Sequence, residues 1–142
     1  KYIFSPRQRG GGIPNIVLNN LDGSPLNLPG LGYPFVPVPL KHGIIDVTGY
    51  RFANVAYLTD CNYIPPASFE LLKGIEVLII DALRYTPSST HFSISEAIEH
   101  AEKLEAERTY FTHICHDVDH SEGNAKLPEN IELAYDGLRL EL

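Results

Sequence analysis

The second half of the chain alternates between apolar, strand-like runs and a helix-like repeat, and this alternation restricts the possible folds most. Residues Glu76 to Ile80 form an apolar run that ends in Asp81, as a buried strand does. Ser93 to Glu105 repeats apolar residues at helical spacing behind a capping box. Arg108 to His113 has the composition of a further strand. Strands that alternate with helices predict an α/β fold in which helices cover a sheet.

The part before this alternation contains three extended runs, Phe35 to Leu40, Ile44 to Tyr50 and Ala53 to Thr59. Their short, turn-rich spacing predicts an antiparallel meander, and the prolines of the first run predict an edge strand. Pro65 to Leu72 is predicted to be a short helix. Ile131 to Leu142 is predicted to form a terminal hairpin.

Composition narrows the classes of protein to which the chain can belong. It has 142 residues, is 44% hydrophobic and carries a net charge of −7. No apolar run approaches the roughly 20 residues of a membrane span, and no basic surface for nucleic acid is apparent. Two isolated cysteines are typical of a reduced, cytoplasmic setting, so we expect a soluble cytoplasmic protein. Because the chain contains no methionine and starts with Lys1, we also expect that an upstream segment is missing.

Histidines and aspartates stand where the predicted strands end. His42, His91 and His113 lie at strand ends or in the following loops, and Asp60 and Asp81 close two further strands. Such residues can converge on one rim of a sheet. The densest group is residues 112–120, THICHDVDH, whose imidazoles and carboxylates suit zinc, manganese or iron. A polar surface loop without a metal is the alternative interpretation.

Six segments occur in a recognisable order. They are PLKHG (39–43), YLTDC (57–61), LIIDALRY (78–85), THFS (90–93), FTHICHDVDH (111–120) and ELAYDGLRLEL (132–142). Together they resemble the carboxyl-terminal part of the metallo-β-lactamase-fold hydrolases, especially the branch containing phosphoribosyl cyclic phosphodiesterase. The resemblance implies an α/β fold that is the C-terminal half of an αβ/βα four-layer sandwich. It makes residues 1–142 one partial domain, in which a loop-rich lead-in (1–34) precedes a β-meander and alternating strands and helices (35–142).

The resemblance also implies a metal centre. His42 is expected to bind the first of two divalent ions, Zn or Mn, and His116 the second. Asp60 is expected to bridge both ions. The implied reaction is the hydrolysis of a small phosphodiester or related ester by a hydroxide that the two metals activate.

Other residues receive roles outside the ligand set. His91 resembles the catalytic histidine that donates a proton to the leaving oxygen. Asp81, His113 and Asp117 are expected to support the site without binding the metals. His100, on the polar face of the predicted helix, is expected to be solvated.

The family's HxHxDH motif, which supplies most of the ligands, is absent from this sequence. The alternative function is therefore a non-catalytic, truncated half-domain that self-associates, or that needs its missing N-terminal half. A sheet left half covered favours a homodimer. A nuclease of the same superfamily is not expected, because the acidic chain shows no surface for a polynucleotide.

Overall fold

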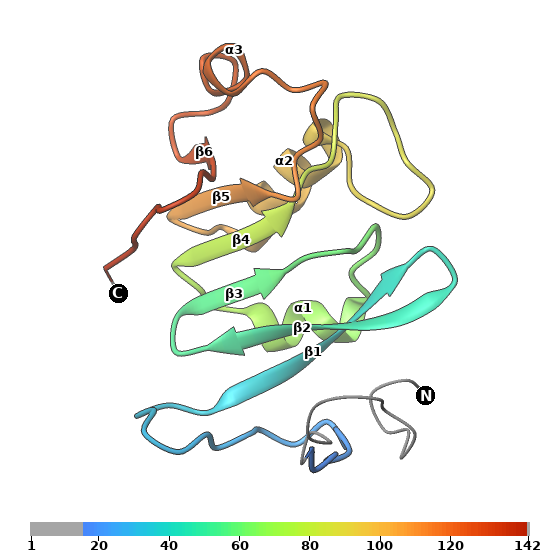
Figure 1. The fold of residues 1–142 in the computed structure, drawn as a ribbon, viewed down its shortest axis with the longest axis vertical. Helices are drawn as coiled ribbons and strands as arrows, with labels where there is room; N and C mark the ends of the chain where they lie inside the picture. The colour runs from blue at the N-terminus through green and yellow to red at the C-terminus, as the bar shows by residue number, and fades with distance from the viewer. Residues whose placement is uncertain (1–15, 142) are drawn as a thin grey trace, which may run out of the picture.

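The structure is a computed structural model that describes residues 16–141, so expectations for residues 1–15 and 142 lie outside the described residues. It contains a six-stranded mixed sheet and three helices (Figure 1). This confirms the predicted α/β class. The elements are β1 (Phe35–His42), β2 (Ile45–Phe52), β3 (Val55–Leu58), α1 (Pro66–Leu72), β4 (Val77–Asp81), α2 (Ile94–Leu104), β5 (Arg108–Thr112), α3 (His120–Asn124) and β6 (Ile131–Leu133).

The strands lie in the sheet in the same order as in the chain. Strands β1, β2 and β3 pair antiparallel, which confirms the predicted meander, and β1 lies at the edge as its prolines require. Strands β3 to β6 pair in parallel, so α1 and α2 serve as crossovers between them. No helix within the described part is long and apolar enough to span a membrane.

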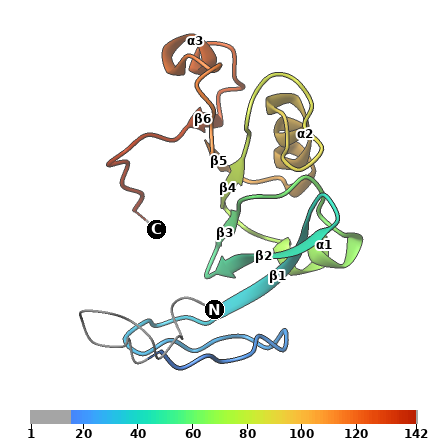
Figure 2. The same ribbon diagram turned by 45° about the vertical axis from the view of Figure 1, so that its right-hand side comes forward.

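Helices α1 and α2 lie on the same face of the sheet (Figure 2). The main core forms between them and the strands, where Leu40, Leu58, Ile80 and Phe111 are fully buried. Helix α2 begins with the predicted capping box, in which the Ser93 side chain and its partner at the third helical position hold each other's backbone amides. The capping box therefore starts α2 at the position from which its apolar residues pack on the sheet.

The opposite face of the sheet carries no helix (Figure 2). There the prediction of a hairpin over Ile131 to Leu142 is wrong for the described residues, because β6 ends at Leu133 and pairs in parallel with β5. The chain then turns through Gly137 (φ +89°) and runs across this face. Its apolar side chains pack on a small cluster there. The cluster and its neighbours include Val55, Val77, Tyr110, Leu138 and Leu140.

His100 of α2 is only partly exposed, so the prediction that it is solvated is also wrong. Its ring centroid lies 4.5 Å from that of Phe92 and 5.9 Å from that of Phe69 in α1. Its Nδ1 atom is buried and has no hydrogen-bond partner among residues 16–141. Burial lowers the pKa of the imidazole below its ordinary value, since desolvation penalises the charged form.

The strand directions bring one set of loops together. Two antiparallel steps separate β1 from β3, so β1 points the same way as the parallel strands. The carboxyl ends of β1, β3, β4 and β5 therefore meet at one edge of the sheet, where Asp81 pairs with Thr112 (Figure 1). All the predicted metal and catalytic residues lie at these strand ends or in the loops that leave them.

Candidate metal centre

Three side chains from separate segments converge at this edge. They are His42, the last residue of β1, Asp60, just beyond β3, and His91, in the loop between β4 and α2. One ligand-type atom from each lies within 4.8 Å of the others. The rings of His42 and His91 are perpendicular, with centroids 4.7 Å apart. The structure thus brings together three of the residues predicted for the site.

Hydrogen bonds on both sides of its ring orient His91. Its Nδ1 lies 2.9 Å from the Thr90 hydroxyl oxygen, and its Nε2 lies 3.4 Å from Asp60 Oδ1. The His91 side chain is only 15% exposed. Metal-binding histidines are usually held by a bond at one nitrogen while the other binds the metal, and here that other nitrogen lies beside Asp60.

His113 approaches the same carboxylate from β5. Its Nε2 lies 3.5 Å from Asp60 Oδ1, and its ring stacks on that of His91 with centroids 4.9 Å apart. Asp60 and His113 both have left-handed backbones, with φ of 55° and 57°. Such conformations are uncommon for residues other than glycine and cluster at functional sites. His113 is therefore part of the centre, although it stands outside the group of three.

Asp81 lies buried beneath these residues at the end of β4. Its Oδ1 accepts hydrogen bonds from the backbone N–H (3.2 Å) and thiol (3.3 Å) of Cys61, and its Oδ2 accepts one from the N–H of Phe92 (3.3 Å). Burial raises the pKa of the Asp81 carboxyl, although these hydrogen bonds and nearby His91 act in the opposite direction. Burial, together with the Asp81 charge, raises the pKa of the Cys61 thiol, so this cysteine stays protonated.

His116 and Asp117 lie outside the group. The His116 side chain is 95% exposed, and its Nε2 lies 3.4 Å from Asp117 Oδ1. Both follow His113 in a turn that ends before α3. The structure places the predicted ligand His116 in solvent and the predicted supporting residue His113 next to Asp60.

Two residues that form hydrogen bonds within the centre, Thr90 and Asn62, were not predicted from the sequence. Thr90 holds the His91 ring, and the Asn62 side chain joins two of the loops. The THFS segment contains a signal for Thr90, because a hydroxyl directly before a histidine can reach its ring. Asn62 has no comparable signal, since its partners are distant in the chain.

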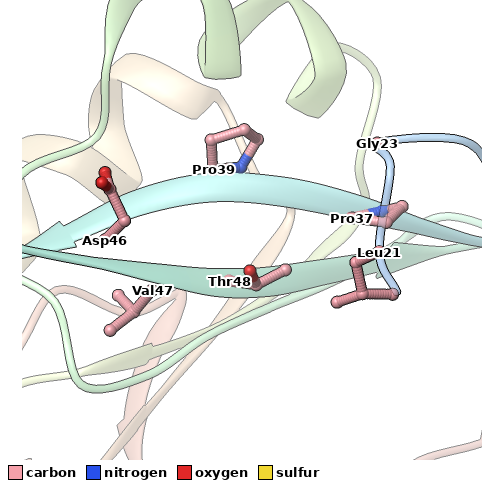
Figure 3. A pocket seen from close by; sticks show the side chains of 7 residues that line it. All are labelled: Leu21, Gly23, Pro37, Pro39, Asp46, Val47 and Thr48. Atoms are coloured by element: carbon pink, nitrogen blue, oxygen red, sulfur yellow. The ribbon is translucent and has the colours of Figure 1, made fainter. Parts of the chain in front are cut away.

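A cavity of about 230 Å³ lies elsewhere, between the segment before β1 and the strands β1 and β2 (Figure 3). Pro37 and Thr48 line it from the two strands, and Leu21 lines it from the preceding segment. None of the converging histidines lines this cavity. The candidate centre is an open rim of the sheet and not this cavity.

The donor set fits a divalent metal. Two imidazole nitrogens and a carboxylate oxygen match the ligands of zinc, manganese and iron. The group comes from three segments that the sheet fixes, and the second nitrogen of His91 already has a partner. The residues present therefore suit the ion that the resemblance implies.

A mixed sheet with helices on one face and an imidazole–carboxylate group at the strand ends defines an α/β protein of the metallo-β-lactamase fold. Residues 1–114 match the family described as the beta-lactamase superfamily domain. The chain belongs to this family.

Among solved structures, the chain is similar to a protein described as a new diphosphatase from the PhnP family, with 48% identity and a TM-score of 0.81. That match covers 84% of this chain and 47% of the other. The metallo-beta-lactamase fold protein YhfI from Bacillus subtilis matches at 17% identity and a TM-score of 0.68, over 86% and 54% of the two chains. The short form of human tRNase Z matches at 18% identity and a TM-score of 0.58. That match covers 75% of this chain and 40% of the other. The last two show the fold alone.

A curated relative from Porphyromonas gingivalis (strain ATCC BAA-308 / W83) is named octanoyltransferase. It is 32% identical over 104 residues, which are 72% of this chain and 21% of that protein. The chain thus spans about a fifth of this relative and less than two thirds of each solved structure. The names of three of these relatives, the diphosphatase, tRNase Z and the octanoyltransferase, are those of enzymes.

Proposed function

We propose that this chain contributes part of a metal-dependent hydrolase that cleaves a small phosphodiester or related ester. The convergence of His42, Asp60 and His91 carries the proposal. The 48% identity to a protein described as a diphosphatase supports a phosphate-containing substrate. Zinc or manganese is the proposed cofactor, with two ions in the complete site.

Each residue of the centre has a proposed task. His42 and Asp60 hold a metal ion, and His91 is its third ligand because its Nε2 faces Asp60 while Thr90 holds its Nδ1. A bound divalent ion supplies Lewis acidity toward a phosphoryl oxygen and toward water. His113 donates the proton to the leaving oxygen, since it lies beside Asp60 but outside the group of three.

These tasks differ from those that the resemblance implies for His91 and His113. The resemblance gives proton donation to His91, whereas its ring geometry favours metal binding. His116 remains the proposed ligand of a second ion in the complete site, which needs ligands beyond the group of three. The resemblance also implies that Asp60 bridges both ions.

The charge of the chain supports a small substrate. Its net charge is −7, so the protein repels a long polyanion, whereas bound cations attract a single phosphate group locally. We therefore propose neither a nucleic acid nor a membrane as a partner.

Metal binding by an Asp60→Asn variant tests the proposal. We expect wild-type protein to bind zinc or manganese and to hydrolyse bis(p-nitrophenyl) phosphate. Asp60→Asn should lower metal affinity by more than the about 10- to 100-fold loss typical of an outer supporting residue. Glu129→Gln, at an exposed position, removes the same charge as a matched control. Wild-type protein that binds no metal would refute the proposal.

A second candidate is a non-catalytic half-domain that forms a homodimer. The helix-free face of the sheet favours it, because Tyr57 of β3 is 39% exposed there, although Tyr33 and the C-terminal segment also pack on this face. Metal content and molecular mass separate the two candidates. A dimer without metal or activity supports the half-domain, whereas a metal-loaded, active protein supports the hydrolase.

A further inference from the structure

The side chain of Asn62 spans two loops of the candidate centre. Its Oδ1 accepts a hydrogen bond from the backbone N–H of Gly43 at 2.7 Å, and its Nδ2 donates one to the carbonyl of Ser89 at 3.0 Å. Gly43 directly follows His42, and Ser89 lies two residues before His91. One amide group therefore links the segments that carry two of the three converging side chains.

The two linked segments are also in close contact. Gly43 has a φ of +60°, and a Cβ atom on it would lie 3.3 Å from both the Ser89 carbonyl oxygen and the Thr90 Cγ2 atom. A larger residue would push the loop away, so glycine permits this approach. The hydrogen bonds of Asn62 thus act at a point where the turn after β1 and the loop before α2 already touch.

The backbone around Asn62 is fixed independently of its side chain. Its N–H donates to the carbonyl of Lys41 at 2.8 Å, and the N–H of Lys41 donates to the carbonyl of Tyr63 at 3.0 Å. Asn62 is also two residues from Asp60. Its amide therefore projects from a segment that an isolated β-bridge ties to the end of β1.

The link continues to the imidazole of His91. Ser89 is followed by Thr90, whose hydroxyl lies 2.9 Å from His91 Nδ1. A shift of the Ser89 carbonyl would move Thr90 and change the direction of His91 Nε2. On the other side, a shift of Gly43 would move His42 directly.

We propose that Asn62 is a positioning residue that sets the separation between His42 and His91 and so prepares the metal centre. Its effect on metal affinity rests on the proposed function, whereas its effect on the two rings does not. Asn62 contacts neither imidazole in the described residues and acts through the two backbones. Its loss should lower metal affinity by about 10- to 100-fold, the range for residues that orient ligands.

The test compares Asn62→Ala with Asn130→Ala. Asn130 is a matched control because its side chain also bonds a backbone carbonyl, that of Ala106, at 3.3 Å near the opposite edge of the sheet. Long-range ¹H–¹⁵N spectra of metal-free protein report the rings of His42 and His91. Titration with Co²⁺, followed by its visible absorption, reports affinity and coordination geometry.

We expect Asn62→Ala to shift both ring signals, to weaken Co²⁺ binding and to alter the Co²⁺ spectrum, while Asn130→Ala leaves all three unchanged. Asn62→Asp keeps the size and the acceptor for Gly43 but sets an oxygen against the Ser89 carbonyl. It should therefore shift His91 more than His42, and it provides a second variant if Asn62→Ala does not fold.

The outcomes distinguish the two proposals. Ring signals that stay unmoved in both Asn62 variants would overturn the positioning role, whether or not the wild type binds Co²⁺. Shifted rings with an unchanged Co²⁺ affinity would also overturn it. Shifted rings in a protein whose wild type binds no Co²⁺ would support the positioning role and overturn the proposed metal-dependent function.

Discussion

Asp60 and His113, two neighbouring residues of the candidate centre, both have left-handed backbone conformations. This conformation costs roughly 1–3 kcal/mol for a residue other than glycine, and aspartate adopts it more readily than most. Cross-loop hydrogen bonds hold the neighbouring residues, so the surrounding structure maintains both conformations. At His113 the unusual φ accompanies a side chain that lies beside Asp60, whereas His116 lies in solvent.

The two histidines of the THICH segment should therefore respond differently to substitution. We expect His113→Ala to lower turnover by about 10²- to 10⁴-fold while metal content is retained, because it removes a proton donor. His116→Ala should change metal content little at a site formed by the group of three. Zinc analysis and turnover of bis(p-nitrophenyl) phosphate check both. Full metal content with lost turnover in His91→Ala would instead assign proton donation to His91.

The buried carboxylate of Asp81 ties together the backbones that follow Asp60 and His91. In Asp81→Asn, one oxygen becomes an NH₂ group that faces an N–H donor of Cys61 or Phe92. An unpaired buried donor costs about 1–3 kcal/mol, so we expect the free energy of unfolding to fall by that amount. Urea denaturation measures it, with exposed Asp136→Asn as control. Equal stability of the two variants would contradict the role of Asp81.

At the scale of elements, helix α2 packs on its neighbours through an unexpected imidazole. His100 lies against the rings of Phe69 and Phe92, so the neutral form is favoured. Among the charged residues of α2, Lys103 also lowers the pKa of His100. Glu99 and Glu96 raise the pKa of His100, but less than burial lowers it. Protonation of His100 thus opposes the packing of α2 on α1 and on the loop before it.

This arrangement predicts a loss of stability in acid. The pKa of His100 is lower in the folded chain than the ordinary value of 6.5, so the unfolded chain binds more protons as the pH falls below that value. Stability should therefore decline from about pH 6.5 downward until the folded pKa is passed. His100→Leu should reduce this decline, whereas His116→Leu, at an exposed position, should not. Urea denaturation at pH 7.5 and pH 5 distinguishes them.

Most elements could be predicted because their signals are local. The apolar run before Asp81 and the capping box at Ser93 each specify an element without knowledge of its partners. The terminal hairpin could not be excluded from the sequence, since Asp136-Gly137 does form a turn, although no return strand follows it in the described residues. His100 falls at a polar position of the helical repeat, and the approach of Phe92 and of Phe69 in α1 covers it.

Some residues of the candidate site could also be predicted from local signals, whereas others could not. The positions of His42, Asp60 and His91 at strand ends could be predicted, because parallel strands end at one edge. Spacing alone does not show which imidazole of THICH points inward, since that depends on the φ of His113. The bonds of Asn62 join residues 19 and 27 positions away, so no local pattern reveals them.

At the scale of the whole molecule, the sheet has two unequal faces. Gly49 of β2 lies so close to Leu40 and Leu58 on the helix-covered face that an added Cβ would approach their side chains to within 3 Å. On the other face, the packing of the described residues includes a small cluster with the C-terminal segment and the stacked rings of Tyr33, Phe35 and Phe52. Tyr57 of β3 is 39% exposed there. Tyr57 is in register with Tyr50 of β2 and Ile79 of β4, so apolar side chains from three strands lie side by side on this face, as they do at sites of association.

We therefore predict that the 142-residue chain forms a homodimer through this face, and that a charge at its centre prevents it. In Tyr57→Glu the carboxylate would lose its hydration at the interface, so the dimer should dissociate to monomers. Leu71→Glu is the control, because Leu71 is 37% exposed in α1, which lies on the helix-covered side of the sheet. Sedimentation equilibrium over a range of concentrations measures the dissociation constant. A wild-type monomer at all concentrations, or equal dissociation of both variants, would show that the helix-free face does not mediate self-association.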